Sequence, residues 1–414
     1  MHVLVLNCGS SSLKFQLMRV DYETIQNNAE ELLAKGLIER IGSQALITLQ
    51  SPPHKAIKLA QALKNHAQAI DFVLKWLISD ESKIPGVQSL TAIQAVGHRV
   101  VHGGEKFKTS VLIDDKVIEG IQECIDLAPL HNPANLSGIA AIQASLGPQL
   151  PQVAVFDTAF HATMPESSYI YPIPYQYYRR YKVRRYGFHG TSHRYIAYRY
   201  RQLKGKDKQD VKVITLHLGN GCSACAIDQG VSIDTSMGMT PLEGLVMGSR
   251  AGDIDPAILE FLHLKEGMSY ESLYSMLNKQ SGLIGISGLT NDMRELIDEQ
   301  NENHDRRAEL AIEIFCQRIK KYIGAYLARL NGADAIIFSG GIGENAATIR
   351  QKICEGMEFM GLVIDPQKNA SMVGGQEGSI AASSSRLDIL VVPTNEELLI
   401  ARDTFRAIVP APLS

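Results

Sequence analysis

The sequence predicts an α/β fold built from two similar domains, and three observations lead to that prediction. Apolar strand-like runs alternate with helix-like segments along the whole chain, which is typical of α/β proteins. The opening stretch VLVLNCGSSSLKFQL resembles VITLHLGNGCSACAI at 213–227, and two such strand–turn–strand copies suggest a duplicated domain. The length of 414 residues suits two or three domains of roughly 150 residues each.

The expected strands are short apolar runs bounded by turn residues, and they lie at 3–6, 95–101, 153–156, 211–218, 335–338 and 390–392. The expected helices show a longer apolar period, and they lie at 66–78, 256–263, 306–330 and 346–354. Asp305 is the expected N-cap of the third helix and Gly332 its expected stop. The polar segments 205–210 and 374–386 are expected to be loops.

Composition argues against several classes of protein. No apolar run approaches the ~18 residues that a membrane span needs, and the N-terminus starts directly with a strand, so a cytoplasmic protein with no membrane partner is expected. Residues 175–188 interleave aromatic and basic side chains, but the net charge is −3, which disfavours nucleic acid as a partner. Packing at a domain edge or a dimer interface is the preferred interpretation of that segment.

The six cysteines are scattered and form no disulfide framework. Cys222 and Cys225 have the C-x-x-C spacing, but Ala226 and Ile227 follow them. A redox motif normally opens a helix, whereas this sequence favours a strand.

Three turns rich in Gly, Ser or Asn follow apolar strands, at 7–14, 219–221 and 340–345. Glycines let backbone N–H groups approach a phosphate, and a helix N-terminus adds partial positive charge. No Walker loop occurs. The third turn also fits a dinucleotide fingerprint, with 362–365 as its second strand. That alternative leaves the other two turns without a role, so one phosphate site built from all three is favoured.

Together these segments resemble the acetate kinase family, of the acetate and sugar kinase and actin superfamily. Nine motifs carry the resemblance in order along nearly the whole chain: NCGSSSLKF, GHRVVHGG, APLHNP, FDTAFH, YGFHGTSH, HLGNG, MGMTPLEGLVMGSRAGDIDP, GGIGEN and PTNEEL. The resemblance implies Mg²⁺-dependent, reversible, in-line phosphoryl transfer from ATP to acetate, giving acetyl phosphate and ADP, with Mn²⁺ as a possible substitute metal. It also implies an actin-like (ribonuclease H-like) fold, a homodimer, an N-terminal domain of 1–156 with 396–414, and a nucleotide-binding domain of 157–395.

The resemblance assigns catalytic roles to Arg99, Asp157, His189 and Arg250. Arg99 would bind the acetate carboxylate with its fork of N–H groups, whereas an isolated Arg at a strand end is more often a surface ion pair. Arg250 and His189 would contact the transferring phosphoryl group. Because acetate is ionised near neutral pH, Asp157 is expected to act by charge and orientation, fixing Arg99 or a metal-bound water, and not as a base.

The resemblance also supplies the binding residues. A small methyl pocket would be lined by Val101, Leu130 and Phe188, of which Leu130 could equally be core. Mg²⁺ would be held by Asn7 and Glu396, since magnesium needs few protein ligands, while Glu397 is expected to be a helix-surface charge. ATP would contact Ser12, Lys14, His217, Leu218, Gly219, Asn220, Gly221, Asp292, Met293, Arg294, Gly341, Ile342, Gly343, Glu344 and Asn345.

Two alternatives stay open. A propionate or other short-chain acyl kinase of the same family differs only in pocket volume, and one methylene is worth only about 1–3 kcal/mol of discrimination. An actin-related module that binds ATP without acyl transfer is a different class, and the pair of arginines at 99 and 250 argues against it.

Overall fold

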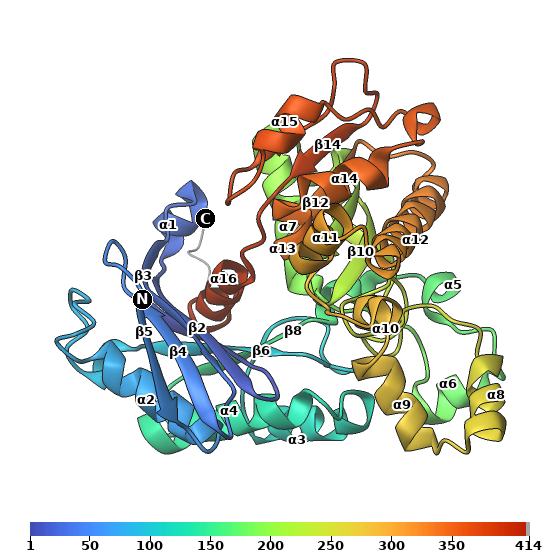
Figure 1. Cartoon of the computed structure of the whole chain (residues 1–414). Coiled ribbons are helices and arrows are strands. Elements are labelled where there is room, and N and C mark those ends of the chain that lie inside the picture. The colour runs from blue at the N-terminus through green and yellow to red at the C-terminus, as the bar shows by residue number, and fades with distance from the viewer. Residues whose placement is uncertain (411–414) are drawn as a thin grey trace. The chain divides into compact units, whose positions relative to one another are not determined.

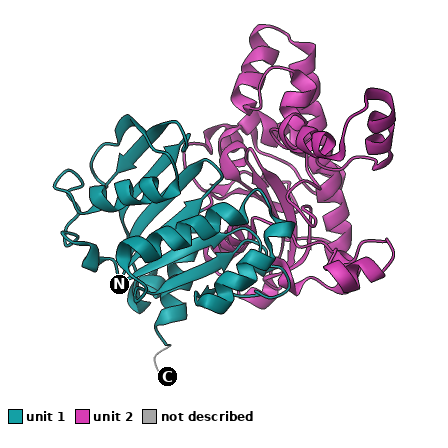
Figure 2. Cartoon of the chain, turned by 90° about the horizontal axis from the view of Figure 1, so that it is seen from below, with its two compact units in different colours: residues 1–160, 395–414 teal, residues 161–394 magenta. Residues whose placement is uncertain are grey.

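The computed structural model describes residues 1–410, and the chain divides into two compact units. Unit 1 contains residues 1–160 and the C-terminal segment from Asn395, and unit 2 contains residues 161–394; Figure 2 colours them separately. Residues 157–160 and Asn395 therefore fall in unit 1, whereas the resemblance had placed them in the second domain. The functional roles assigned to the two domains stay predictions.

Within residues 1–410, unit 1 is built around an eight-stranded sheet of order β5-β4-β3-β2-β1-β6-β8-β7. The pairs β1–β6 and β6–β8 are parallel, and the others are antiparallel. The strands are β1 (His2–Cys8), β2 (Ser12–Arg19), β3 (Glu31–Glu39), β4 (Gln44–Gln50), β5 (Ile57–Ala62), β6 (Ala95–Val100), β7 (Val111–Leu112) and β8 (Gln152–Phe156). The helices are α1 (Tyr22–Asn27), α2 (His66–Leu77), α3 (Asp115–Glu123), α4 (Asn132–Leu146) and α16 (Glu396–Ile408).

Strand β1 shows why a continuous apolar run suits the middle of this sheet. Alternate side chains of a strand face opposite sides. Val3 and Val5 pack in the cluster that includes Phe405 of α16, while Leu4 and Leu6 pack in the cluster that includes residues of α2. Both faces are covered by helices, so neither needs polar side chains.

Helix α16 packs with the beginning of the chain, as expected from the resemblance, which joined 396–414 to residues 1–156. The Asn395 side chain accepts a hydrogen bond from the Leu398 N–H and so caps the helix. Ile400 and Phe405 enter the core beside β1. Figure 1 shows α16 against the strands of unit 1.

Unit 2 contains a six-stranded sheet within the described residues, in the order β11-β10-β9-β12-β14-β13. Its strands are β9 (Lys212–Leu218), β10 (Cys222–Asp228), β11 (Val231–Thr235), β12 (Ala335–Ser339), β13 (Gly378–Ser379) and β14 (Asp388–Val391). Its helices are α5 (Glu166–Tyr169), α6 (Gln176–Tyr181), α7 (Gly190–Lys204), α8 (Ala257–Glu266), α9 (Tyr270–Lys279), α10 (Gly282–Ser287), α11 (Met293–Glu302), α12 (Arg306–Leu330), α13 (Gly340–Asn345), α14 (Ala347–Cys354) and α15 (Pro366–Ser371).

The two sheets share one topology. The order β3-β2-β1-β6-β8-β7 in unit 1 corresponds strand for strand to β11-β10-β9-β12-β14-β13 in unit 2. The orientations match as well, because in each set two antiparallel pairs are followed by two parallel pairs and a final antiparallel pair. The predicted duplication is therefore confirmed.

Each expected strand and helix is present, with ends displaced by at most a few residues. The prediction of a glycine-rich loop at 340–345 is wrong, because α13 begins at Gly340 directly after β12. The strand at 362–365 that the dinucleotide-binding alternative requires is also predicted wrongly. Ile364 forms only an isolated bridge, and the Asp365 side chain caps α15.

Cys222 and Cys225 lie in β10, as expected, and every cysteine in the described residues is buried and reduced. No helix within residues 1–410 combines the length and apolar composition required to cross a membrane.

Candidate active site

The polar residues predicted for acetate and metal meet at one edge of the unit 1 sheet. Asn7 lies near the end of β1, Arg99 near the end of β6, and Asp157 directly after β8. These three strands are parallel, so their carboxyl ends share an edge. Glu396 reaches the same edge as the first residue of α16.

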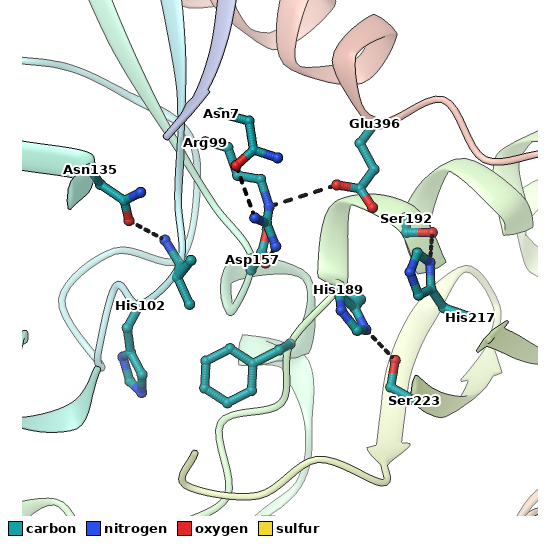
Figure 3. A network of polar contacts seen from close by, with 12 residues as sticks. Asn7, Arg99, His102, Asn135, Asp157, His189, Ser192, His217, Ser223 and Glu396 are labelled. Atoms are coloured by element: carbon teal, nitrogen blue, oxygen red, sulfur yellow. Dashed lines mark hydrogen bonds and ion pairs between the residues drawn. The ribbon is translucent and has the colours of Figure 1, made fainter. Parts of the chain in front are cut away.

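Arg99 is the centre of this group (Figure 3). Its Nε donates to Asp157 Oδ1 over 3.0 Å, its Nη2 pairs with Asp157 Oδ2, and its Nη1 donates to Asn7 Oδ1 over 3.1 Å. Glu396 Oε2 lies 3.7 Å from Arg99 Nε. Burial alone would lower the pKa of Arg99, but the carboxylates of Asp157 and Glu396 outweigh it and hold the pKa above its usual range.

These contacts limit how Arg99 can bind a substrate. The Nε–Nη2 edge of the guanidinium is occupied by Asp157. Within unit 1, Nη1 and Nη2 each make one hydrogen bond, so each terminal nitrogen keeps one further N–H group for another acceptor. The structure thus brings Asp157 onto Arg99, which is one of the two partners predicted for it.

Lys14 and Glu397 differ from expectation. Glu397 was predicted to be a surface charge, and this is wrong: its carboxylate is buried and lies 2.6 Å from Lys14 Nζ. The Lys14 ammonium predicted to contact ATP therefore already has a carboxylate partner in unit 1. Ser12 closes the opening bend, where its carbonyl accepts from the Gly9 N–H over 2.9 Å.

The residues predicted for the methyl pocket fall in both units. In unit 1, Val101 is buried and its N–H donates to Asn135 Oδ1 over 3.1 Å. Leu130 is 40% exposed, so it is not a core residue. Phe188 is fully buried in unit 2, next to His189. A pocket formed by all three stays a prediction.

His189 lies at the start of α7 in unit 2. It takes the left-handed conformation with φ +54°, which is uncommon for a residue other than glycine and is often found at functional sites. Its Nδ1 lies 2.9 Å from Ser223 Oγ, and its ring packs against that of His217 at 4.2 Å between centroids, with a tilt of 30° between the ring planes. His217 Nδ1 lies 2.8 Å from Ser192 Oγ, as Figure 3 shows.

Arg250 reaches the same region of unit 2. Its Nη1 donates to the carbonyl of Pro241 over 3.1 Å. A Cβ at Gly221 would lie 3.6 Å from both Arg250 Nη1 and His189 Nε2. The absence of a side chain at 221 therefore keeps open the space that these two donors share.

A cavity of about 820 Å³ in unit 2 has the size of a nucleotide pocket. Eight of the predicted ATP-binding residues line it, namely Gly219, Asn220, Asp292, Met293, Arg294, Gly341, Ile342 and Asn345. The sequence interpretation missed the other lining residues, which are Asn291, Ile297, Asp298, Ala346, Ala347, Thr348, Ala370 and Val373. Ala370 and Val373 are distant in sequence from the motifs, so no local pattern marks them.

The remaining predicted nucleotide residues do not line the cavity. Leu218 is buried in the sheet. The Glu344 carboxylate turns onto the backbone, accepting from the N–H groups of Gly340 at 2.9 Å and Thr394 at 3.1 Å. Asp292, by contrast, does line the cavity; it caps α11, and its hydrogen bonds with Arg294 lower the pKa of its carboxyl group.

The duplicated sheet, the arginines of the two units and the large cavity in unit 2 define the class of protein: an α/β phosphotransferase with the actin-like fold. The crystal structure of Porphyromonas gingivalis acetate kinase has this fold, with a TM-score of 0.90, 46% identity, and coverage of 99% of this chain and 100% of that chain. The predicted fold class is confirmed. A propionate kinase from Francisella tularensis gives a TM-score of 0.89 at 43% identity, covering 98% of this chain and all of that one.

This chain belongs to the acetokinase family, whose profile matches residues 2–402. It is 59% identical over 413 residues to the acetate kinase of Chloroherpeton thalassium, with 99% of each chain covered. It is 56% identical over 412 residues to the acetate kinase of Solibacter usitatus, with 100% of this chain and 99% of that one covered.

Proposed function

We propose that this chain catalyses reversible phosphoryl transfer from ATP to acetate, giving acetyl phosphate and ADP. The observation that carries the proposal is family membership over residues 2–402, together with full-length relatives named acetate kinase. We assign the acyl substrate to the unit 1 group around Arg99, and the nucleotide to the unit 2 cavity. A homodimer and a cytoplasmic location belong to the same proposal.

The reaction needs no general base in the forward direction. An acetate oxygen forms a bond to the γ-phosphorus, and the bond from that phosphorus to the β–γ bridging oxygen breaks, releasing ADP as an anion. Acetate is already ionised near neutral pH, so no proton leaves the nucleophile. The work of the protein is to orient two anions and to compensate their charge.

In unit 1, Arg99 binds the acetate carboxylate through its Nη1–Nη2 edge. Asp157 holds the opposite edge of the guanidinium and so fixes its plane. A fixed plane matters because two parallel N–H groups must match two carboxylate oxygens. Asp157 is a positioning residue in this scheme.

In unit 2, the cavity holds the nucleoside, and residues at the starts of α11 and α13 line it, where helix N–H groups can meet phosphate oxygens. His189 and Arg250, which both lie close to Gly221, donate hydrogen bonds to the γ-phosphoryl oxygens. Charge that builds on these oxygens during transfer is stabilised by both groups.

Magnesium fits the oxygen donors of unit 1. Asn7 supplies an amide oxygen and Glu396 supplies a carboxylate, which are the hard ligands that Mg²⁺ prefers; Mn²⁺ accepts the same set. The bound ion would neutralise charge on the phosphate oxygens. No three His, Cys, Asp or Glu side chains within residues 1–410 form a metal cluster.

Propionate is the second candidate substrate, because the Francisella tularensis neighbour is named a propionate kinase. A hydroxamate assay of the purified full chain with ATP and Mg²⁺, using acetate, propionate and butyrate, tests both. We expect kcat/KM to be highest for acetate. The side chain of Val101 is larger than that of an alanine, which would leave room for a longer acid. A preference for butyrate would contradict a small pocket. If no acyl phosphate formed with any of the three acids, the proposed function would be overturned.

A further inference from the structure

A chain of buried hydroxyl and imidazole groups connects strand β9 to His189 within unit 2. Thr215 Oγ1 lies 2.7 Å from His193 Nδ1, and His193 Nε2 lies 2.7 Å from Ser223 Oγ. Ser223 Oγ lies 2.9 Å from His189 Nδ1; Figure 3 draws this last contact. Thr215, His193 and Ser223 are completely buried, so their polar atoms depend on one another for hydrogen bonds.

The neutral His193 ring leaves only two possible directions for the hydrogen bonds that it makes with Thr215 and Ser223. Burial lowers the pKa of His193 well below its usual value, and neighbouring His161 and His217 lower it further. The ring is therefore neutral and carries one N–H, so one nitrogen donates and the other accepts. Either Thr215 donates to Nδ1 and Nε2 donates to Ser223, or both hydrogen bonds are reversed.

Thr215 selects between the two directions. Across residues 1–410, its hydroxyl has one hydrogen-bond partner, which is His193 Nδ1. If Thr215 accepted from His193, its own proton would be buried without an acceptor, which is costly. Thr215 must therefore donate to Nδ1, and His193 Nε2–H then donates to Ser223.

The direction carries through to His189. The Ser223 hydroxyl accepts from His193 and has a single proton of its own. Its other neighbour is His189 Nδ1, so that nitrogen receives the proton as an acceptor. A neutral imidazole that accepts at Nδ1 carries its proton on Nε2.

We propose that Thr215, His193 and Ser223, called the relay below, hold His189 as the neutral tautomer protonated on Nε2. Arg250 Nη1 and His189 Nε2 each lie 3.6 Å from the position of a Cβ at Gly221, so the N–H and the guanidinium border the same space. His189 then donates to an anion without first taking up a proton. The use of that donor toward a phosphoryl oxygen rests on the proposed function, whereas the tautomer is a property of the free protein.

Nitrogen NMR of the substrate-free full chain tests the tautomer directly. The protein is labelled with ¹⁵N-histidine, ring signals are recorded near pH 8, and His189 is assigned by comparison with His189→Gln. We expect an unprotonated Nδ1 and a protonated Nε2. A protonated Nδ1, or signals averaged between the two tautomers, would overturn the proposal whatever the variants below do.

Thr215→Val then tests the relay, because it removes the hydroxyl and nearly keeps the shape. With no group to select the direction, His189 should show both tautomers. The kcat should fall by about tenfold, the value of one net hydrogen bond, with KM for ATP little changed. Thr215→Ser is the matched control, and it should keep the ring signals and kcat of the wild type.

Unchanged His189 ring signals in Thr215→Val would show that the tautomer is set locally, and the relay would be rejected. If the role of Thr215 were only structural, Thr215→Val would lower the melting temperature without moving those signals. If the assay for acyl phosphate fails while the ring signals behave as expected, the relay stands and the proposed function falls. The two conclusions are therefore tested separately.

Discussion

Asp157 holds Arg99 through two hydrogen bonds, and at the residue scale this pairing determines what the negative charge at 157 can do. Asp157→Asn keeps the shape but removes the charge that compensates a largely buried guanidinium. We expect kcat to fall by about 10²–10³-fold, the range for loss of one preorganised electrostatic group. KM for acetate should rise as well, because the plane of Arg99 is no longer fixed. Steady-state kinetics of both substrates measures these changes.

Asp403→Asn is a suitable control for that variant. Asp403 is also a buried carboxylate of unit 1, and it accepts a hydrogen bond from Ser110 over 2.7 Å, away from the candidate site. Its kcat should stay close to that of the wild type. The wild-type transfer step should also show little solvent deuterium effect. A large effect that disappears in Asp157→Asn would mean that Asp157 moves a proton after all.

Neighbouring residues with the same charge show where sequence interpretation reaches its limit. Glu396 and Glu397 are consecutive at the start of α16, and successive positions on a helix point about 100° apart. Glu396 faces Arg99, while Glu397 is buried against Lys14. The motif marked the right pair, but only the packing of α16 on the sheet decides which cation each carboxylate meets.

At the element scale, Gly340 shows how closely the start of α13 packs on the end of β9. Gly340 has φ +75°, and a Cβ there would lie 2.7–2.8 Å from backbone atoms of Leu218. Gly340→Ala should therefore lower the free energy of unfolding by about 2–3 kcal/mol, from left-handed strain and this contact. Urea denaturation followed by circular dichroism measures the change.

Gly341 is the matched control, because a Cβ at that position meets nothing within 4 Å. Gly341→Ala should leave the urea midpoint unchanged or slightly higher, since alanine favours a helix over glycine. Equal losses in the two variants would show that the whole turn, and not the contact with Leu218, limits stability. The sequence indicated a phosphate-binding turn here, but it could not reveal that the helix starts without an intervening loop.

Helix α16 depends on a buried ion pair with the beginning of the chain. The side chains of Arg402 and Glu30 are each 2% exposed, and Arg402 Nη2 donates to Glu30 Oε2 over 2.8 Å. Arg402→Met leaves a buried carboxylate without its cation and should cost about 3–5 kcal/mol of unfolding free energy. The double variant Arg402→Met with Glu30→Leu should recover most of that loss. If the double variant were as unstable as Arg402→Met, the guanidinium would be needed for other contacts.

At the scale of the whole molecule, the duplication was the part of the fold most accessible from sequence. The strands β1 and β9 read as apolar runs because helices cover both faces of their sheets, and the turns after them carry the same small residues. Only half of the residues that line the cavity could be predicted from the sequence. Gly219, Asn220 and Gly341 follow strand ends, whereas Ala370 and Val373 reach the cavity through tertiary packing that no short-range pattern encodes.

Buried histidines in both units should make the whole protein sensitive to acid. Burial lowers the pKa of His98 in unit 1 and of His161 in unit 2 to about 4, from an ordinary value of 6.5. Between pH 6.5 and pH 4 these two histidines bind protons in the unfolded chain but stay neutral in the folded chain. The free energy of unfolding is therefore greatest above pH 6.5 and falls as the pH is lowered toward 4. Each histidine should contribute about 1.4 kcal/mol per pH unit in that window.

His98→Gln isolates one of these contributions. His98 Nε2 lies 2.7 Å from Gln152 Oε1, and a glutamine amide can donate to that oxygen without titrating. Between pH 6.5 and pH 5 the wild type should lose about 2 kcal/mol more unfolding free energy than His98→Gln, from 1.5 pH units at one group. Urea denaturation at both pH values measures the difference. Equal losses would mean that His98 is protonated in the folded protein at pH 5, and the acid sensitivity would then have to come from carboxylates that lose their native partners.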